Sequence, residues 1–277
     1  MRVRFWGVRG TIPAPGPETI RFGGNTPCID ILTSDQQLII IDAGTGIRLL
    51  GAELSRSGLG NIDATLLLSH THWDHIQGLP FFEPLLRRRN NFVLYGPQRT
   101  NLPLEETIAR QFLEPYLPFA YRSLAAELKV VEKRAGETIQ ISPDTLVKIE
   151  ALKHPGGCLG FRIEDKDSVL AYCTDTSHLE GQLTEGVMKL AEGADLLIHD
   201  THFRNKSEAK KFEDWGHSSW EQAVQVAKQA RVGMLALFHY SPELADNAVD
   251  EIAVTARQSF SRTIASREGL RLDLPIG

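Results

Sequence analysis

Short runs of apolar residues, bounded by glycine, proline, asparagine or aspartate, recur along the chain and predict β-strands. Many of these runs hold β-branched residues, which favour the pleated backbone of a sheet. We expect strands over residues 2–6, 28–33, 37–42, 64–69, 91–95, 128–132, 145–152, 158–164, 168–173, 194–199 and 234–239. Each run is far shorter than the roughly 18 apolar residues that a membrane-spanning helix needs.

Helical periodicity is found in fewer places. We expect helices over residues 45–56, 104–113, 183–192, 218–231 and 245–265. The clearest start is Ser218–Gln222, which offers a capping box ahead of apolar residues at helical spacing. Strands dominate the first half in hairpin-like pairs, and strands alternate with helices mainly in the second half. This order favours an α+β class, with helices packed outside the sheets, over a doubly wound sheet.

The chain has no fixed-period repeat and no linker rich in proline, glycine or serine, so we expect one domain over residues 1–277. The stretch 97–127 stands apart because it combines four prolines with several aromatic residues. It is long for a plain connection and predicts a helical, aromatic insertion. Two interpretations remain open: the insertion shapes a pocket, or it packs on its own aromatic residues.

Charge and cysteine content narrow the function classes. The formal net charge is −5, from 30 basic and 35 acidic residues, so we expect no strong nucleic-acid footprint. Cys28, Cys158 and Cys173 form no Cys-x-x-Cys pair, which is typical of reduced thiols in the cytoplasm. The first residues read as a strand rather than as a signal peptide. We therefore expect a cytoplasmic protein with no membrane partner.

One short segment carries most of the candidate chemistry. Residues 69–75 read Ser-His-Thr-His-Trp-Asp-His, although the whole chain holds only 9 histidines. In an extended backbone, residues two apart face the same side, so His70 and His72 can ligate one metal ion. Asp74 and His75, past the bend, can turn toward a second ion. Imidazole nitrogen and carboxylate oxygen suit zinc, manganese or iron.

Three further residues of ligand type each follow an apolar strand. His154 follows the predicted strand 145–152, Asp175 the strand 168–173, and His239 ends the strand 234–239. Any one of them alone is better explained as an ordinary core or loop residue. Because strand ends can converge on one rim of a sheet, the three residues and the segment 69–75 together predict a metal centre.

The order His-x-His-x-Asp-His, lone His, lone Asp, lone His is similar to that of the metallo-β-lactamase superfamily, and the stretches Phe5–Gly10 and Ile41–Gly46 also match its first strands and turns. The resemblance implies a four-layer αβ/βα sandwich, in which two mixed sheets face each other with helices outside. It also implies two divalent metal ions per chain, Zn²⁺ or Mn²⁺ or iron. The implied ligands are His70, His72 and His154 for the first ion, Asp74, His75 and His239 for the second, and Asp175 as the bridge.

Three later segments resemble the phosphodiesterase branch of that superfamily, which includes the tRNA 3′-processing endonuclease, RNase Z. They are Leu197–His202, Trp215–Ser219 and Leu237–Pro242. In that branch an acidic residue pairs with the histidine of a Gly-His-Ser-[Ser/Thr] motif. Asp200 and His217 occupy those positions here.

The cleavage of a phosphodiester needs a proton for the leaving alkoxide, and imidazole titrates near neutral pH. We therefore expect His217 to be the general acid and Asp200 to orient it. Asp74 is a third catalytic candidate, as the residue that orients the attacking water. His199 is a candidate for a supporting donor behind the ligands, and His202 reads as a loop residue.

The resemblance also bears on the class of substrate. RNase Z usually has glycine where Trp73 stands and carries a long glycine- and proline-rich arm, and we find neither here. The chain instead resembles bacterial class II-like cyclic-nucleotide phosphodiesterases, which implies a small phosphodiester substrate, a nucleotide, and a homodimer. RNase Z-like cleavage of tRNA is the alternative. A non-catalytic metal-binding sensor is the alternative of a different class.

Overall fold

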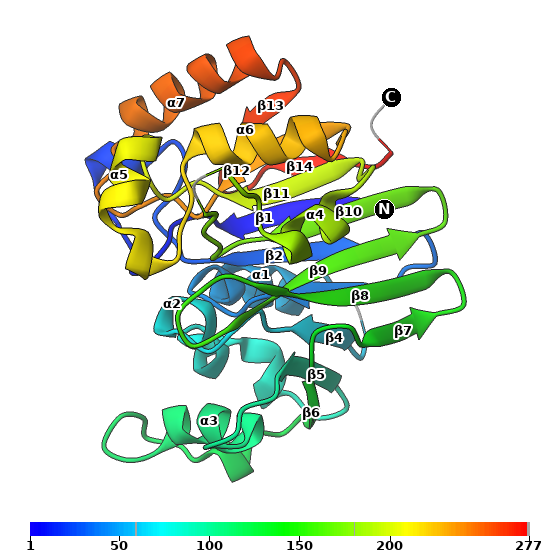
Figure 1. Ribbon diagram of the computed structural model, residues 1–277. Helices are drawn as coiled ribbons and strands as arrows, with labels where there is room; N and C mark the ends of the chain where they lie inside the picture. The colour runs from blue at the N-terminus through cyan, green and yellow to red at the C-terminus, as the bar shows by residue number, and fades with distance from the viewer. Residues whose placement is uncertain (59, 180, 276–277) are drawn as a thin grey trace.

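The structure is a computed structural model that describes residues 1–58, 60–179 and 181–275 (Figure 1). Over these residues the strands form two sheets of seven strands each. The first sheet has the order β14-β1-β2-β3-β4-β5-β6. Its strands are β1 (Arg2–Gly7), β2 (Cys28–Leu32), β3 (Leu38–Ile41), β4 (Asp63–Leu67), β5 (Asn91–Pro97), β6 (Glu127–Lys133) and β14 (Arg271–Asp273).

The second sheet has the order β13-β12-β11-β10-β9-β8-β7. Its strands are β7 (Thr138–Ser142), β8 (Thr145–Leu152), β9 (Cys158–Asp165), β10 (Ser168–Cys173), β11 (Leu196–Asp200), β12 (Met234–Phe238) and β13 (Thr263–Ala265). Both sheets are mixed. Strands β3 to β6 of the first and β10 to β13 of the second run parallel, and the remaining pairs are antiparallel.

Helices cover the outer faces of the sheets. The α-helices are α1 (Gly46–Arg56), α2 (Trp73–Ile76), α3 (Leu104–Ala109), α4 (Glu185–Ala191), α5 (Lys206–Lys211), α6 (Trp220–Gln229) and α7 (Asp246–Ser259). Short 3₁₀ turns are η1 (Pro17–Thr19), η2 (Leu79–Phe81), η3 (Glu83–Leu86), η4 (Arg110–Phe112), η5 (Tyr121–Ser123) and η6 (Glu213–Trp215). Helix α1 packs on β1 and β2, α4 on β8 to β10, and α6 on β11 and β12. In the described part of the chain no helix has the length and apolarity to cross a bilayer.

The alternation of side chains along each strand explains the two apolar layers. On β3, Ile39 and Ile41 point into the core between the sheets, and Ile40 points into the core under α1 and α2. All three are fully buried, which is why this strand reads as an unbroken apolar run. Phe5 of the first sheet and Phe238 of the second meet across the central core, with ring centroids 6.1 Å apart. The predicted sandwich of two mixed sheets with outer helices is confirmed.

Most of the predicted elements are present, with three corrections. The helix expected over 245–265 ends at Ser259, because residues 263–265 instead pair in parallel with β12 as β13. The strands β7, β13 and β14 were not predicted, since they are short or rich in polar residues. Helices α2 and α5 were also missed: α2 spans only four residues, and only Ala209 of the six residues of α5 is buried, so no apolar period marks it.

The hairpin-like pairing expected in the first half holds only for the earliest strands. Strands β1, β2 and β3 are antiparallel neighbours, but β3, β4, β5 and β6 run parallel. Parallel neighbours need a crossover connection, and α1, the segment around α2, and α3 supply it. The expectation was wrong because apolar strand runs alone do not show the direction of pairing.

The stretch 97–127 is the crossover between β5 and β6 and contains α3, η4 and η5. Phe112 is buried and packs against Phe119 and Tyr121, with ring centroids 6.0 and 5.6 Å away. Tyr116 does not join this cluster and is 76% exposed. The stretch therefore combines an inner aromatic cluster with one outward-facing aromatic ring.

Deleting a large side chain between the sheets tests this packing. Phe161 lies on β9 and is 1% exposed, so Phe161→Ala is expected to lower the free energy of unfolding by about 3–5 kcal/mol. Denaturant titration followed by circular dichroism measures the change. The control is Val254→Ala on the outer face of α7, expected to stay within about 0.5 kcal/mol of the parent. A Phe161 variant as stable as the control would contradict the assigned core.

Candidate metal centre

The predicted ligands come together at one edge of the sandwich, where strands of both sheets end. The segment 69–75 follows β4 of the first sheet and leads into α2, with His72 as the extended residue before the helix. From the second sheet, His154 follows β8, Asp175 follows β10, and His239 follows β12. The carboxyl ends of β10, β11 and β12 meet at this edge because these strands are parallel.

The first group of donor atoms consists of His70, His72 and His154, whose ligand atoms lie within 4.8 Å of one another. His154 Nε2 lies 3.1 Å from His72 Nδ1. One oxygen of Asp175, Oδ1, lies 3.8 Å from His70 Nε2 and 3.7 Å from His154 Nε2. These four side chains therefore surround one common point.

The second group consists of Asp74, His75 and His239. His75 Nε2 and His239 Nε2 are 3.3 Å apart, and they lie 3.3 and 3.2 Å from Asp74 Oδ2. The other oxygen of Asp175, Oδ2, lies 3.2 Å from His75 Nε2 and 3.3 Å from His239 Nε2. Asp175 thus presents one oxygen to each group, as a bridging ligand does.

The donor set fits two divalent ions. His70 Nε2 is buried and has no hydrogen-bond partner among the described residues, yet it faces Asp175. Burying a polar atom without a partner is costly, and a cation between the groups would remove that cost. Burial acts to raise the pKa of Asp175, but the neighbouring histidines hold that pKa well below its usual range. An ionised carboxylate among imidazole nitrogens is a suitable ligand set for zinc, manganese or iron.

A second layer of residues orients the ligands. His75 Nδ1 donates to Asp42 Oδ2 over 2.8 Å, which leaves Nε2 facing the other donors. Asp42 is itself held by the hydroxyl groups of Tyr172 and Ser69, at 2.7 and 2.9 Å. The backbone N–H of Thr11 donates to Asp74 Oδ2 over 2.7 Å. Such partners fix the tautomer and direction of metal ligands.

Asp42 is the clearest residue of this site whose role sequence reasoning missed. It directly follows β3, an unbroken apolar strand, much as Asp175 follows β10 with one residue between. That position was a usable signal. An aspartate at a strand end can, however, either bind an ion or hydrogen bond to a ligand, and the sequence does not distinguish these two roles. The hydrogen bond to His75 decides the role, and only the fold supplies it.

Two glycines allow the close approach of the backbone to the ligands. A Cβ atom on Gly10 would lie 2.4 Å from the ring of His239. Gly216 has a φ of 77°, and a Cβ there would lie 2.6 Å from His154 Nδ1. His154 Nδ1 also donates to the Gly216 carbonyl over 3.0 Å, so the turn before His217 orients a predicted ligand.

The predicted acid pair is also brought together. His217 Nδ1 lies 2.7 Å from Asp200 Oδ2, and the Asp200 Oδ1 atom accepts the N–H groups of His202 and Ser218, each over 3.0 Å. Burial acts to lower the pKa of His217, but the charge and hydrogen bond of Asp200 raise it above the ordinary value. His217 Nδ1 lies 3.9 Å from Asp175 Oδ1, so the pair borders the bridging position.

The two remaining histidines of this segment pack around the acid pair. His199 Nδ1 donates to the Asp200 carbonyl over 2.8 Å, while its Nε2 lies 3.3 Å from His178 Nε2. His202, which reads as a loop residue in the sequence, is 3% exposed and stacks on His217 with ring centroids 4.4 Å apart. Both residues support the position of Asp200 and His217.

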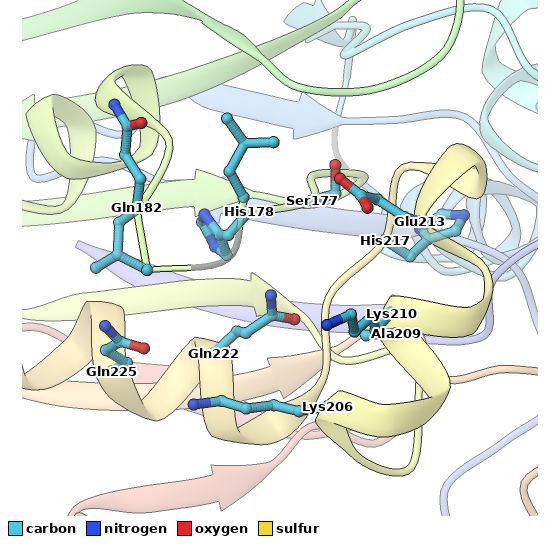
Figure 2. Close-up of a pocket in the computed structure, with 13 residues that line it drawn as sticks. Ser177, His178, Gln182, Lys206, Ala209, Lys210, Glu213, His217, Gln222 and Gln225 are labelled. Atoms are coloured by element: carbon cyan, nitrogen blue, oxygen red, sulfur yellow. The ribbon is translucent and has the colours of Figure 1, made fainter.

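Pockets open around this edge, and two of them bear on the site. One opens beside His217, between the segment around His178 and helices α5 and α6, and Figure 2 shows His217 and Glu213 at one end of it. Its lining includes the polar side chains of Gln222 and Gln225. The other lies beside the segment 69–75 and is lined by Trp73, with Tyr116 and its neighbours from the stretch 97–127.

Residues 37–240 match the family model described as the Beta-lactamase superfamily domain. The chain belongs to the metallo-β-lactamase superfamily. This match covers more than half of the chain and includes every predicted metal ligand and both members of the acid pair. The protein is therefore a hydrolase of the metallo-β-lactamase fold.

Known relatives extend the similarity over nearly the whole chain. Ribonuclease Z of Thermoplasma acidophilum is 24% identical, with 100% of this chain and 97% of that protein covered. Among solved structures, the metallo-beta-lactamase fold protein YhfI from Bacillus subtilis has a TM-score of 0.73 at 19% identity, and 98% of each chain is covered. A diphosphatase from the PhnP family has a TM-score of 0.72 at 17% identity, covering 99% of this chain and 98% of that one.

Metal content tests the bridging position of Asp175. Asp175→Ala removes an oxygen from both donor groups, so it is expected to lose both ions, whereas His239→Ala should lose mainly the second. Elemental analysis by mass spectrometry gives the equivalents of metal per chain. The matched control is Asp144→Ala, an exposed carboxylate at the opposite end of β8 from His154, which should keep the full content. Retention of two ions by Asp175→Ala would show that this residue does not bridge them.

Proposed function

We propose that the protein is a metal-dependent phosphodiesterase with two divalent ions, in which His217 is the general acid. The observation that carries the proposal is the contact of His217 with Asp200 at the border of the bridging residue Asp175. A metal centre alone would serve many hydrolytic reactions. A fixed imidazole beside it supplies the proton that a poor leaving group needs.

The division of labour follows from the chemistry of the bond. Two bound ions would supply a nucleophile at neutral pH and neutralise charge on the phosphoryl oxygens. The ligands for them would be His70, His72, His154, Asp74, His75, His239 and Asp175. In addition, Asp74 would orient the attacking water, since it lies in the second donor group and is held by the N–H of Thr11.

His217 is prepared for proton donation by its partner. Asp200 accepts a hydrogen bond from the Nδ1–H group of His217. This leaves Nε2 as the atom that would give its proton to the leaving alkoxide. Asp200 is itself fixed by three backbone N–H groups, those of Asp175, His202 and Ser218, each at 3.0 Å. The carboxylate therefore cannot turn away from the imidazole without losing several hydrogen bonds.

Small nucleotide phosphodiesters, cyclic nucleotides in particular, are the substrates that we propose. The net charge of −5 gives no general attraction to a polynucleotide, and exposed Trp73 and Tyr116 line a pocket next to the predicted ligands. Cleavage of precursor tRNA is the second candidate, and relatives named Ribonuclease Z that span nearly the whole chain support it. We further propose that residues 1–277 act as one catalytic domain and assemble as a homodimer.

A panel of substrates with the metal-loaded protein separates these candidates. It comprises bis(p-nitrophenyl) phosphate, 3′,5′- and 2′,3′-cyclic nucleotides, cyclic dinucleotides, a precursor tRNA and a β-lactam. We expect turnover of bis(p-nitrophenyl) phosphate and of a cyclic nucleotide. Cleavage of the precursor tRNA alone would favour the second candidate, and binding of metal without any turnover would identify a sensor.

The leaving group of the substrate tests the role of His217. His217→Ala is expected to cut turnover by about 10²–10⁴-fold for a ribose leaving group, because an alkoxide needs a proton. The loss should be much smaller for p-nitrophenolate, which departs without one. Asp200→Asn should show the same pattern more weakly, since it orients the imidazole without donating the proton. Kinetics on both substrates and metal content are measured in parallel.

The control for this experiment is Glu213→Gln, which changes an exposed charge in the same pocket as His217. It should leave the ratio of the two turnover rates unchanged. Equal slowing of both substrates by His217→Ala, or the loss of an ion, would mean that His217 is a ligand or a structural residue.

A further inference from the structure

Gln111 is a buried amide that the fold leaves without a partner. It lies in η4, within the stretch 97–127, and is 7% exposed. Neither Oε1 nor Nε2 of its side chain has a hydrogen-bond partner in the part of the chain that the structure describes. An unpaired buried amide is costly, and replacement by an apolar side chain of similar size would avoid that cost. Its presence therefore calls for a partner that the chain itself does not supply.

The same residue lines the pocket beside the segment 69–75. Two large aromatic side chains line this pocket and remain open to solvent, Trp73 at 66% and Tyr116 at 76% exposure. Leu113 is also exposed and lines the same pocket, so these side chains gather in one place, and a contiguous exposed apolar patch marks a binding site more often than a single exposed ring does. Aromatic rings next to an amide are the elements with which proteins hold a nucleobase, by stacking on its face and hydrogen bonding to its edge.

The charged side chains of this pocket pair with each other, which favours binding of a neutral flat ring over binding of a charged group. Glu106 and Arg110 both line it, but they pair with each other over 2.7 Å on neighbouring turns. The pocket also borders the segment that carries several of the predicted metal ligands. Thr71 and Trp73 line it and are immediate chain neighbours of the predicted ligands His70, His72 and Asp74. A nucleotide can therefore place its phosphate at the ligands and its base in this pocket.

We propose that this pocket binds the nucleobase of the substrate, with Gln111 hydrogen bonding to the base edge and Trp73 and Tyr116 stacking on the base. The proposal rests on the phosphodiesterase function above. The amide atoms are closed off from solvent in this structure, so contact with a base would require the side chain to turn toward the pocket. Its N–H donor and C=O acceptor match the N7 and N6 groups of adenine, which makes adenine the preferred base.

Binding of AMP, compared with ribose 5-phosphate, tests the proposal without turnover. Both probes carry the sugar and the phosphate, and only AMP carries a base. Isothermal titration of the metal-loaded protein gives the affinities, and quenching of tryptophan fluorescence reports stacking on Trp73. We expect Gln111→Leu and Tyr116→Ala each to lower the affinity for AMP by about 10-fold. The affinity for ribose 5-phosphate, which is much weaker, should stay within about twofold of the parent in both variants, because only the contact to the base is lost.

The matched control is Gln225→Leu, which removes a glutamine from the other pocket, shown in Figure 2. It should change the affinity of neither probe. Gln111→Glu keeps the size of the side chain but loses the donor, so its preference for AMP over UMP should fall. Thermal unfolding separates binding from a structural role, since Gln111→Leu folds at least as stably as the parent if the buried amide is unpaired.

Two different failures are distinguishable. If the parent protein hydrolyses bis(p-nitrophenyl) phosphate but Gln111→Leu binds AMP as the parent does, the base subsite is wrong and the proposed function stands. An equal loss of affinity for AMP and for ribose 5-phosphate in Gln111→Leu would likewise contradict the proposed base subsite. If the metal-loaded parent hydrolyses no phosphodiester, the proposed function fails, whatever the affinity for AMP.

Discussion

The buried carboxylate of Asp175 is the constraint around which the candidate site is built. It is 2% exposed and lies between two groups of imidazole and carboxylate donors, with one oxygen toward each. A charge at this depth is costly unless cations balance it. The surrounding histidines keep the carboxylate ionised, and two divalent ions would balance the remaining negative charge. The same carboxylate also borders His217, so the proposed metal binding and the proposed proton donation would share one centre.

The rigidity comes from the sandwich. Ligands arrive from strands of both sheets, so the distance between the sheets sets the distance between His70 and Asp175. Buried aromatic side chains such as Phe5 and Phe238 hold that spacing. Asp42 links the layers, because it follows β3 of the first sheet and accepts the hydroxyl of Tyr172 from β10 of the second. A change in the core would therefore move the ligands as well as lower stability.

Backbone conformation at the strand ends shows the cost of this arrangement. Asp42, Asp175 and His239 each follow a strand and have φ values of 59°, 55° and 63°. Residues other than glycine adopt this left-handed region at a cost of roughly 1–3 kcal/mol each, and such residues concentrate at functional sites. Each turn directs a side chain back toward the rim. The hydrogen bonds and ion pairs of the site compensate for the strain.

Sequence by itself determined most of the strands, the α+β class and the candidate ligands, because apolar runs and the dense segment 69–75 are local patterns. The direction of β4, β5 and β6, the strand β13 and the role of Asp42 were decided only by the tertiary structure. The direction of strand pairing depends on the crossover connections between strands. A residue that orients a ligand is marked by no particular residue type or local motif. The same reason explains Gln111: its lack of a hydrogen-bond partner is a property of the packed surroundings, which no stretch of sequence contains.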